Sequence, residues 1–121
     1  MGDRANIAIK QHGGGHVYLY THWGGYDLPD ILKASLKRGK DRWGDEQYLA
    51  RIIFCGMVND DSQGTTGYGI SNSIGDNEHD ILVIDCDKLT VSQCEYDTLD
   101  KPKKTWKFSK YIKLRNGTPV I

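Results

Sequence analysis

The residue types with the most chemistry in this sequence gather between Tyr20 and Asp30, where a strand pattern gives way to a helix pattern. His22, Trp23 and Tyr26 flank a pair of glycines directly before the expected helix N-terminus. Glycines let the backbone approach a ligand, N–H groups at a helix N-terminus can meet an anion, and aromatic rings can stack on a base. This stretch predicts one wall of a binding site for a nucleotide-like ligand.

Two acidic residues at the same helix end disfavour the binding of an anion there. Asp27 has the chemistry of an N-cap and Asp30 falls in the first turn, so both carboxylates would repel a phosphate. A tight strand-to-helix turn with Trp23 in the core is therefore the alternative. Arg4, near the start of the neighbouring strand, is the cation expected to offset that repulsion and orient an anion.

A second stretch, residues 64–71, is rich in hydroxyls and glycine. It lacks the lysine of a phosphate-binding P-loop and the strand-to-helix setting of a dinucleotide fingerprint. We expect a glycine-marked strand that packs closely on Gly56 or on a helix. Thr65, Thr66 and Tyr68 are the side chains of this stretch expected to line a pocket.

Histidines and cysteines offer groups for acid-base or nucleophilic chemistry, but their spacing identifies no catalytic set. Cys55 and Cys86 could pair with His22 or His79, yet no elbow motif accompanies them, and no catalytic residue is assigned. The three cysteines, with Cys94, are an odd number without a C-x-x-C spacing. We expect them to be reduced, small and buried.

Metal-ligating residue types also occur without a metal-binding spacing. His12 and His16 flank three glycines, and residues 76–80 hold two aspartates, a glutamate and a histidine. Solvated loops explain both groups, so neither a metal nor a cofactor is expected.

Length and composition favour one domain outside a membrane. The chain has 121 residues, too few for two ordinary domains, and no apolar run near the roughly 20 residues of a membrane span. The opening Met1-Gly2-Asp3-Arg4 does not resemble a signal peptide. We expect a cytoplasmic protein, placed in the host cytoplasm if it is encoded by a phage.

Charge divides the sequence in two. Residues 1–100 hold nine Lys/Arg and sixteen Asp/Glu, a balance of minus seven, whereas residues 101–121 hold seven Lys/Arg and no acid. We predict a domain over 1–100 and a basic arm or added edge strand over 101–121. From Lys101 to Arg115 lysines alternate with aromatic residues, which can serve single-stranded nucleic acid. Contact between this segment and its own acidic domain is the alternative.

Alternation predicts a hairpin at the N-terminus. Residues 5–10 and 17–23 alternate, and the glycines between them suit a loop. The aliphatic side chains of both strands share one face, assigned to the core. Tyr18, Tyr20 and His22 then share the other face, which is either covered by more chain, used as a subunit interface or used to bind something. Of these we expect Tyr18 and Tyr20 to form the interface of a homo-oligomer.

Two amphipathic helices and three or more strands follow. Asp27 and Asp45 predict helix starts, Gly39 and residues 59–64 predict helix ends, and Gly56 predicts a close approach between elements. Strands are expected at residues 65–71, 81–84 and 89–96, with an edge strand or arm at 105–114. The predicted fold class is α+β, with an antiparallel or mixed sheet of about five to six strands and two helices on one face.

Several separated motifs agree in order with one family. The chain carries Met1-Gly2-Asp3-Arg4-Ala5-Asn6-Ile7, Tyr20-Thr21-His22-Trp23-Gly24-Gly25, Leu49-Ala50-Arg51-Ile52-Ile53-Phe54-Cys55, Thr65-Thr66-Gly67-Tyr68-Gly69-Ile70-Ser71 and Asp76-Asn77-Glu78-His79. In these it resembles small proteins of phages, prophages and bacterial genomes without an established activity, over residues 1 to about 91. The resemblance implies a phage or mobile-element setting and assigns no catalytic residue.

Together these features favour binding over catalysis. We expect a phage-type protein that sequesters a nucleotide-like small molecule or inhibits a host defence protein. The alternatives are a small hydrolase acting on a nucleotide or phosphoester through His22 or His79, and a nucleic-acid-binding protein that uses the basic tail.

Overall fold

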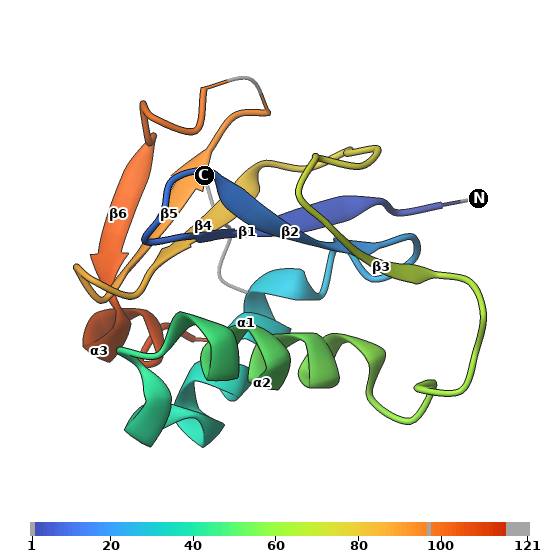
Figure 1. Ribbon diagram of the computed structural model, residues 1–121, viewed down its shortest axis with the longest axis horizontal. Coiled ribbons are helices and arrows are strands. Elements are labelled where there is room, and N and C mark those ends of the chain that lie inside the picture. Colours follow the sequence, from blue (N-terminus) through green and yellow to red (C-terminus); the bar gives the residue numbers. More distant parts are fainter. Residues whose placement is uncertain (1, 97, 116–121) are drawn as a thin grey trace.

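The computed structural model describes residues 2–96 and 98–115 (Figure 1). The elements in chain order are β1 (Ala5–Lys10), β2 (His16–Thr21), α1 (Leu28–Arg38), a 3-10 turn (Lys40–Arg42), α2 (Glu46–Val58), β3 (Tyr68–Ser71), β4 (Ile81–Asp85), β5 (Thr90–Cys94), β6 (Lys104–Lys107) and α3 (Phe108–Tyr111). None of the described helices has both the length and the apolar character that a bilayer crossing demands.

One six-stranded mixed sheet runs through the molecule in the order β3-β2-β1-β4-β5-β6. Strands β1 and β2 form the predicted antiparallel hairpin, with Ile7 opposite Leu19 and Ile9 opposite Val17. Strand β4 returns parallel to β1, and the remaining neighbours pair antiparallel. The predicted α+β class with a mixed sheet is therefore confirmed.

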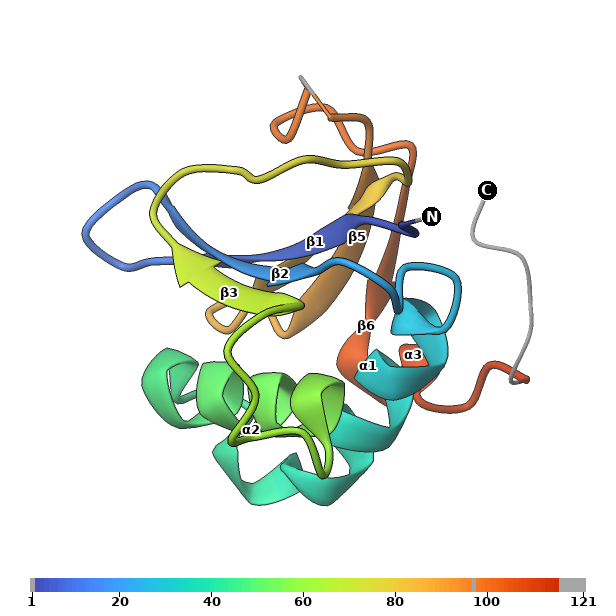
Figure 2. The same ribbon diagram turned by 90° about the vertical axis from the view of Figure 1, so that its right-hand side faces the viewer.

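All three helices lie on the same side of this sheet (Figure 2). Between the two layers lies the larger core, to which the hairpin contributes its aliphatic face as predicted. The strand β4 is buried along its whole length, as expected for a central strand covered on both faces. A smaller apolar cluster of Ala8, Ile81, Val83 and Cys94 lies on the other side of the sheet.

Capping and glycine placement set the helix ends and the helix pair. The Asp45 carboxylate accepts a hydrogen bond from the Tyr48 N–H at 3.1 Å, which confirms it as an N-cap. Asp27 precedes α1, but its side chain makes no cap hydrogen bond. A Cβ on Gly56 would stand 2.5 Å from the Ser35 Oγ, so the predicted close approach is the contact between α2 and α1.

Three local predictions were wrong in the middle of the chain. Cys55 is exposed on the outer side of α2, whereas Cys86 and Cys94 are buried as expected. The strand predicted from residue 65 begins at Tyr68, after the positive φ of +96° at Gly67. That glycine packs against the Trp23 ring and not against Gly56 or a helix.

The strand pattern predicted over residues 105–114 also breaks early. Lys104–Lys107 form the edge strand β6 against β5, and the chain then turns into α3. Phe108 and Tyr111, both fully buried, enter the same core as the hairpin. Their spacing of three residues places them on one side of a helical turn, and this overrides the alternation. The described part of the basic segment is thus packed into the fold.

Two connections occupy the side of the sheet opposite the helices, the segment 72–80 in yellow and the residues 95–96 and 98–103 in orange (Figure 2). Ile74 packs on the small cluster together with Tyr18, and a Cβ on Gly75 would be 3.0 Å from the Tyr20 ring. The chain itself therefore covers part of the aromatic face that was predicted as an interface.

Candidate functional site

Two aromatic residues of the predicted wall, His22 and Trp23, come together with Tyr68 at the junction of β2 and β3. The Trp23 ring meets the His22 ring edge-on at 5.2 Å and the Tyr68 ring edge-on at 6.4 Å. The His22 N–H donates to the Gly67 carbonyl at 2.8 Å, which brings the backbone of Gly67 beneath the indole. Trp23 remains 51% exposed, so it is not a core residue.

The other residues predicted for the binding site do not converge on this cluster. Tyr26 is 82% exposed beyond the turn, and Thr65 and Thr66 are exposed in the loop before β3. Arg4 binds two carboxylates, Glu78 through Nε at 3.1 Å and Asp76 through Nη1 at 3.6 Å. Its charge is therefore committed to the loop 72–80 and does not offset the acids of α1.

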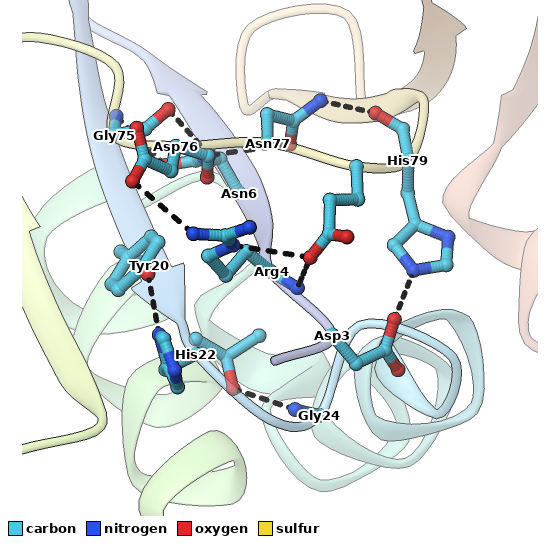
Figure 3. A network of polar contacts seen from close by, with 12 residues as sticks. Asp3, Arg4, Asn6, Tyr20, His22, Gly24, Gly75, Asp76, Asn77 and His79 are labelled. Atoms are coloured by element: carbon cyan, nitrogen blue, oxygen red, sulfur yellow. Dashed lines mark hydrogen bonds and ion pairs between the residues drawn. The ribbon is translucent and has the colours of Figure 1, made fainter. Parts of the chain in front are cut away.

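A polar network ties this loop to the first strand (Figure 3). The Asn6 side chain is fully buried and donates to the Asp76 carbonyl at 3.1 Å, while its oxygen accepts from the Gly75 N–H at 3.3 Å. The His79 Nε2 and the Asp3 Oδ1 lie 2.5 Å apart, and the Tyr26 N–H donates to the other Asp3 oxygen at 2.7 Å. These contacts hold the loop in place beside a small pocket of about 240 Å³, to which Asn6, Tyr20 and Gly75 contribute.

Acid should weaken this attachment through Asp3. The hydrogen bonds from His79 and from the Tyr26 N–H hold the Asp3 pKa below its ordinary value of 3.8. A carboxyl whose pKa is lowered by folding adds stability that is complete above its unfolded pKa and disappears as the pH falls through its folded pKa. Wild type should therefore exceed Asp3→Asn in unfolding free energy from about pH 5 upward, and the difference should shrink below the unfolded value.

Urea unfolding of both proteins across that pH range measures the effect. The matched control is Asp41→Asn, which removes an exposed carboxylate in the 3-10 turn on the far side of α1. A difference between wild type and Asp3→Asn that is independent of pH would show that Asp3 contributes nothing through its charge.

The buried thiols are unsuited to nucleophilic chemistry. Burial, followed by the nearby carboxylate of Glu46, raises the pKa of Cys86 to about 12. Burial also raises the pKa of Cys94. Both thiols stay protonated at neutral pH, and a protonated thiol is a poor nucleophile. In the described part of the chain, no three His, Cys, Asp or Glu side chains form a group that could hold a metal ion.

A larger concavity lies elsewhere, on the open face of the sheet over β4 and β5. This groove has a volume of about 710 Å³, within the range typical of small-molecule sites. It is lined by Lys10, His16, Val83, Asp85, Lys88, Thr90, Ser92, Tyr96, Leu99, Asp100, Pro102 and Thr105.

One end of the groove carries charges of both signs, the ammonium groups of Lys10 and Lys88 and the carboxylate of Asp85. Because β1 and β4 are parallel, their carboxyl ends meet there, and the Lys10 Nζ lies 3.7 Å from the Asp85 Oδ2. The His16 imidazole has a lowered pKa because it is partly buried and because Lys10 repels its protonated form. Lys88 adds a second ammonium from the turn between β4 and β5.

Asp85 stays ionised at that end. Burial opposes its ionisation, but hydrogen bonds from the N–H groups of Lys88 and Asp87, at 3.0 and 2.9 Å, outweigh burial and lower its pKa. The carboxylate shapes the tight turn after β4, as turn-forming aspartates do. Its backbone contacts anchor the position of Lys88 at the groove.

The other end holds Tyr96 and apolar side chains together with the carboxylate of Asp100, and hydroxyls line the floor. Tyr96 is 56% exposed and stands with Leu99 and Pro102 in the segment after β5. Ser92 and Thr105 face each other across β5 and β6, with their hydroxyl oxygens 2.9 Å apart. The groove thus offers cations at one end, hydroxyls along its floor and a ring at the other end.

The sequence contains little that marks this groove. Its lining comes from β1, β2, β4, β5, β6 and two connections, and within each segment the contribution is one or a few ordinary residues. Knowledge of the parallel pairing of β1 with β4 would have indicated the groove, because this pairing brings residue 10 beside residue 85.

Comparison with protein-family models, curated proteins and solved structures gives no match for this chain. The chemistry of the site therefore has to be inferred from its own residues.

Proposed function

We propose that the chain is a non-catalytic binding protein that sequesters a nucleotide-like small molecule in the groove over β4 and β5. The observation that carries the proposal is the arrangement of this groove, in which Lys88 and Lys10, the latter paired with Asp85, stand at one end and the exposed ring of Tyr96 at the other. A phosphate pairs with ammonium groups and a base stacks on an aromatic ring.

The size of the groove and its floor support the same ligand class. A volume of about 710 Å³ suits a molecule with a ring, a sugar and a phosphate. The hydroxyls of Thr90, Ser92 and Thr105 can donate to and accept from sugar hydroxyls. In the phage setting that the family resemblance implies, a host-made nucleotide signal is the ligand we propose.

Sequestration without turnover fits the groups in the groove. The lining includes neither a cysteine nor a carboxylate–imidazole pair, since the Asp3–His79 contact belongs to the loop attachment. His16, with its lowered pKa, is largely neutral at pH 7 and can accept a proton when an anion approaches. We propose that it stabilises a bound phosphate in this way.

Calorimetric titration with AMP, adenosine and inorganic phosphate tests this function. AMP should bind more tightly than either fragment. Lys88→Ala should weaken AMP binding about 10-fold or more without affecting adenosine, because it removes a charge-assisted contact. Tyr96→Ala should weaken both AMP and adenosine by a similar factor, through loss of stacking.

Lys37→Ala is the matched control, an exposed lysine on α1 outside the groove, and it should leave the affinity unchanged. Ligand released by heat and separated by chromatography should be intact AMP. Equal affinity of wild type and both groove variants would overturn the site. Recovery of adenosine and phosphate would instead favour the hydrolase alternative.

A nucleic-acid function through the basic segment has less support from the packing. Two of its three aromatic residues, Phe108 and Tyr111, are fully buried and unable to stack on bases. Lys103 donates to the Asp80 carboxylate at 2.7 Å, and the Lys107 Nζ donates to the Lys88 carbonyl at 3.0 Å. These contacts favour the self-contact interpretation for this part of the segment.

A further inference from the structure

The two edges of the sheet differ in the protection they carry. Strand β6 ends one side with Lys104 and Lys107, and Pro102 precedes it, all of which discourage pairing with another strand. Strand β3 ends the other side with Tyr68-Gly69-Ile70-Ser71 and carries neither charge nor proline. An edge of this kind is open to a further strand.

The uncharged character extends well beyond β3. Residues 62–75 are fourteen consecutive positions without Asp, Glu, Lys or Arg, although charged residues make up 26% of the whole chain. Within this run Ile70 is 61% exposed, an apolar side chain in the middle of an edge strand. Trp23, 51% exposed against Gly67, adds apolar surface at the start of the same edge.

The backbone of β3 provides the hydrogen-bonding groups for a partner strand. Its pairing with β2 is antiparallel, with Leu19 opposite Ile70 and Tyr20 opposite Gly69. In an antiparallel pair, every second residue turns its N–H and C=O away from the neighbour. Another extended chain can satisfy these outward groups, which otherwise bond to water.

We propose that β3 pairs antiparallel with β3 of a second copy of this chain, across a two-fold axis at Ile70, so that two sheets join into one. At such an axis a residue meets its own copy, and charges near it would face like charges. An uncharged run centred close to Ile70 avoids this repulsion, and the two Ile70 side chains bury each other. Because the run is neutral on both sides of the axis, a second copy of the same edge meets no like charge there.

This interface is distinct from the aromatic face predicted from the sequence, which the loop 72–80 partly covers. It also leaves the groove over β4 and β5 open, since β2 and β1 separate β3 from β4 in the sheet. Dimerisation and ligand binding can therefore fail independently of each other.

The test is the molar mass in solution, measured by light scattering over a concentration series. Wild type should reach twice the mass of the chain. Ile70→Lys and Ile70→Glu should each remain monomeric, with unchanged far-ultraviolet circular dichroism, because each places like charges at the axis. An equimolar mixture of the two should recover the dimer, since opposite charges then meet at the axis.

Tyr48→Lys is the matched control, with the same charge added at an exposed aromatic residue of α2, and it should dimerise like wild type. A wild type that stays monomeric at every concentration overturns the proposal and would leave the edge to a strand of another protein. A dimer that survives Ile70→Lys, or a mixture that stays monomeric, overturns it as well.

Discussion

Replacing Phe108 with alanine is expected to lower the unfolding free energy by about 3–5 kcal/mol, the usual cost of truncating a buried aromatic residue. The Phe108 ring is fully buried and meets the Trp43 ring edge-on at 5.3 Å. Its N–H also donates to the Leu89 carbonyl at 2.8 Å, so the residue joins the end of β6 to the turn before β5. Truncation would leave a cavity where the C-terminal segment joins the core.

Urea denaturation monitored by circular dichroism measures this loss. Lys110→Ala is the control on the same short helix, because Lys110 is exposed, and it should change the unfolding free energy by less than about 0.5 kcal/mol. If Phe108→Ala lost no more than Lys110→Ala, the segment after residue 103 would be an attached arm and not part of the core.

The second large effect is expected at Gly67. Its φ of +96° is unfavourable for any residue with a side chain, at about 1–2 kcal/mol. A Cβ there would also stand 2.1 Å from the Trp23 Cζ3, a distance that forces the indole or the strand to move. Such overpacking costs a further 1–3 kcal/mol or so. Gly67→Ala should therefore be destabilising by about 2–5 kcal/mol in total.

Gly14→Ala separates the backbone cost of the positive φ from the cost of overpacking against Trp23. Gly14 has a φ of +99°, but no atom lies within 4 Å of its added Cβ, so only the backbone cost applies. In the Trp23→Ala background, Gly67→Ala should lower the unfolding free energy only as much as Gly14→Ala does. Equal losses at Gly67 and Gly14 in the wild-type background would show that the indole does not pack on Gly67.

Local patterns predicted the elements whose causes are local. The alternation of residues 5–10 and 17–23 predicted the hairpin and its core face, and Asp45 predicted the start of α2. The apolar run 81–84 predicted a strand buried on both faces. In each case the element is determined by the pattern of one strand face or by one cap, and the residues concerned lie within a few positions of one another in the sequence.

Predictions failed where the deciding contact is distant in the sequence. Arg4 was expected to orient an anion, but the loop 74 residues away supplies Glu78 to its Nε. The residues from Phe108 onward were interpreted as strand because lysines and aromatics alternate, whereas burial of Phe108 and Tyr111 in the core selects a helical turn. Neither contact is encoded in a local pattern.

The candidate site was the least predictable part. His22 and Trp23 were singled out from the sequence because the glycines beside them are a local signal, but their contact with Tyr68 was not predicted. The groove was not found, since it arises from the parallel pairing of β1 with β4 and from the segment that follows β5. The proposed ligand class is the one expected from the sequence, but the proposed location is new.

Amide NMR spectra recorded during titration with AMP test the proposed binding site most directly, because they report both binding and its place in the fold. The largest shifts should fall on Lys10, His16, Lys88, Ser92 and Tyr96, which line the groove, and the spectra should stay constant with time because AMP is not consumed. Shifts confined to Arg4, His22 and Trp23, or a spectrum that AMP does not change, would contradict a nucleotide-binding groove over β4 and β5.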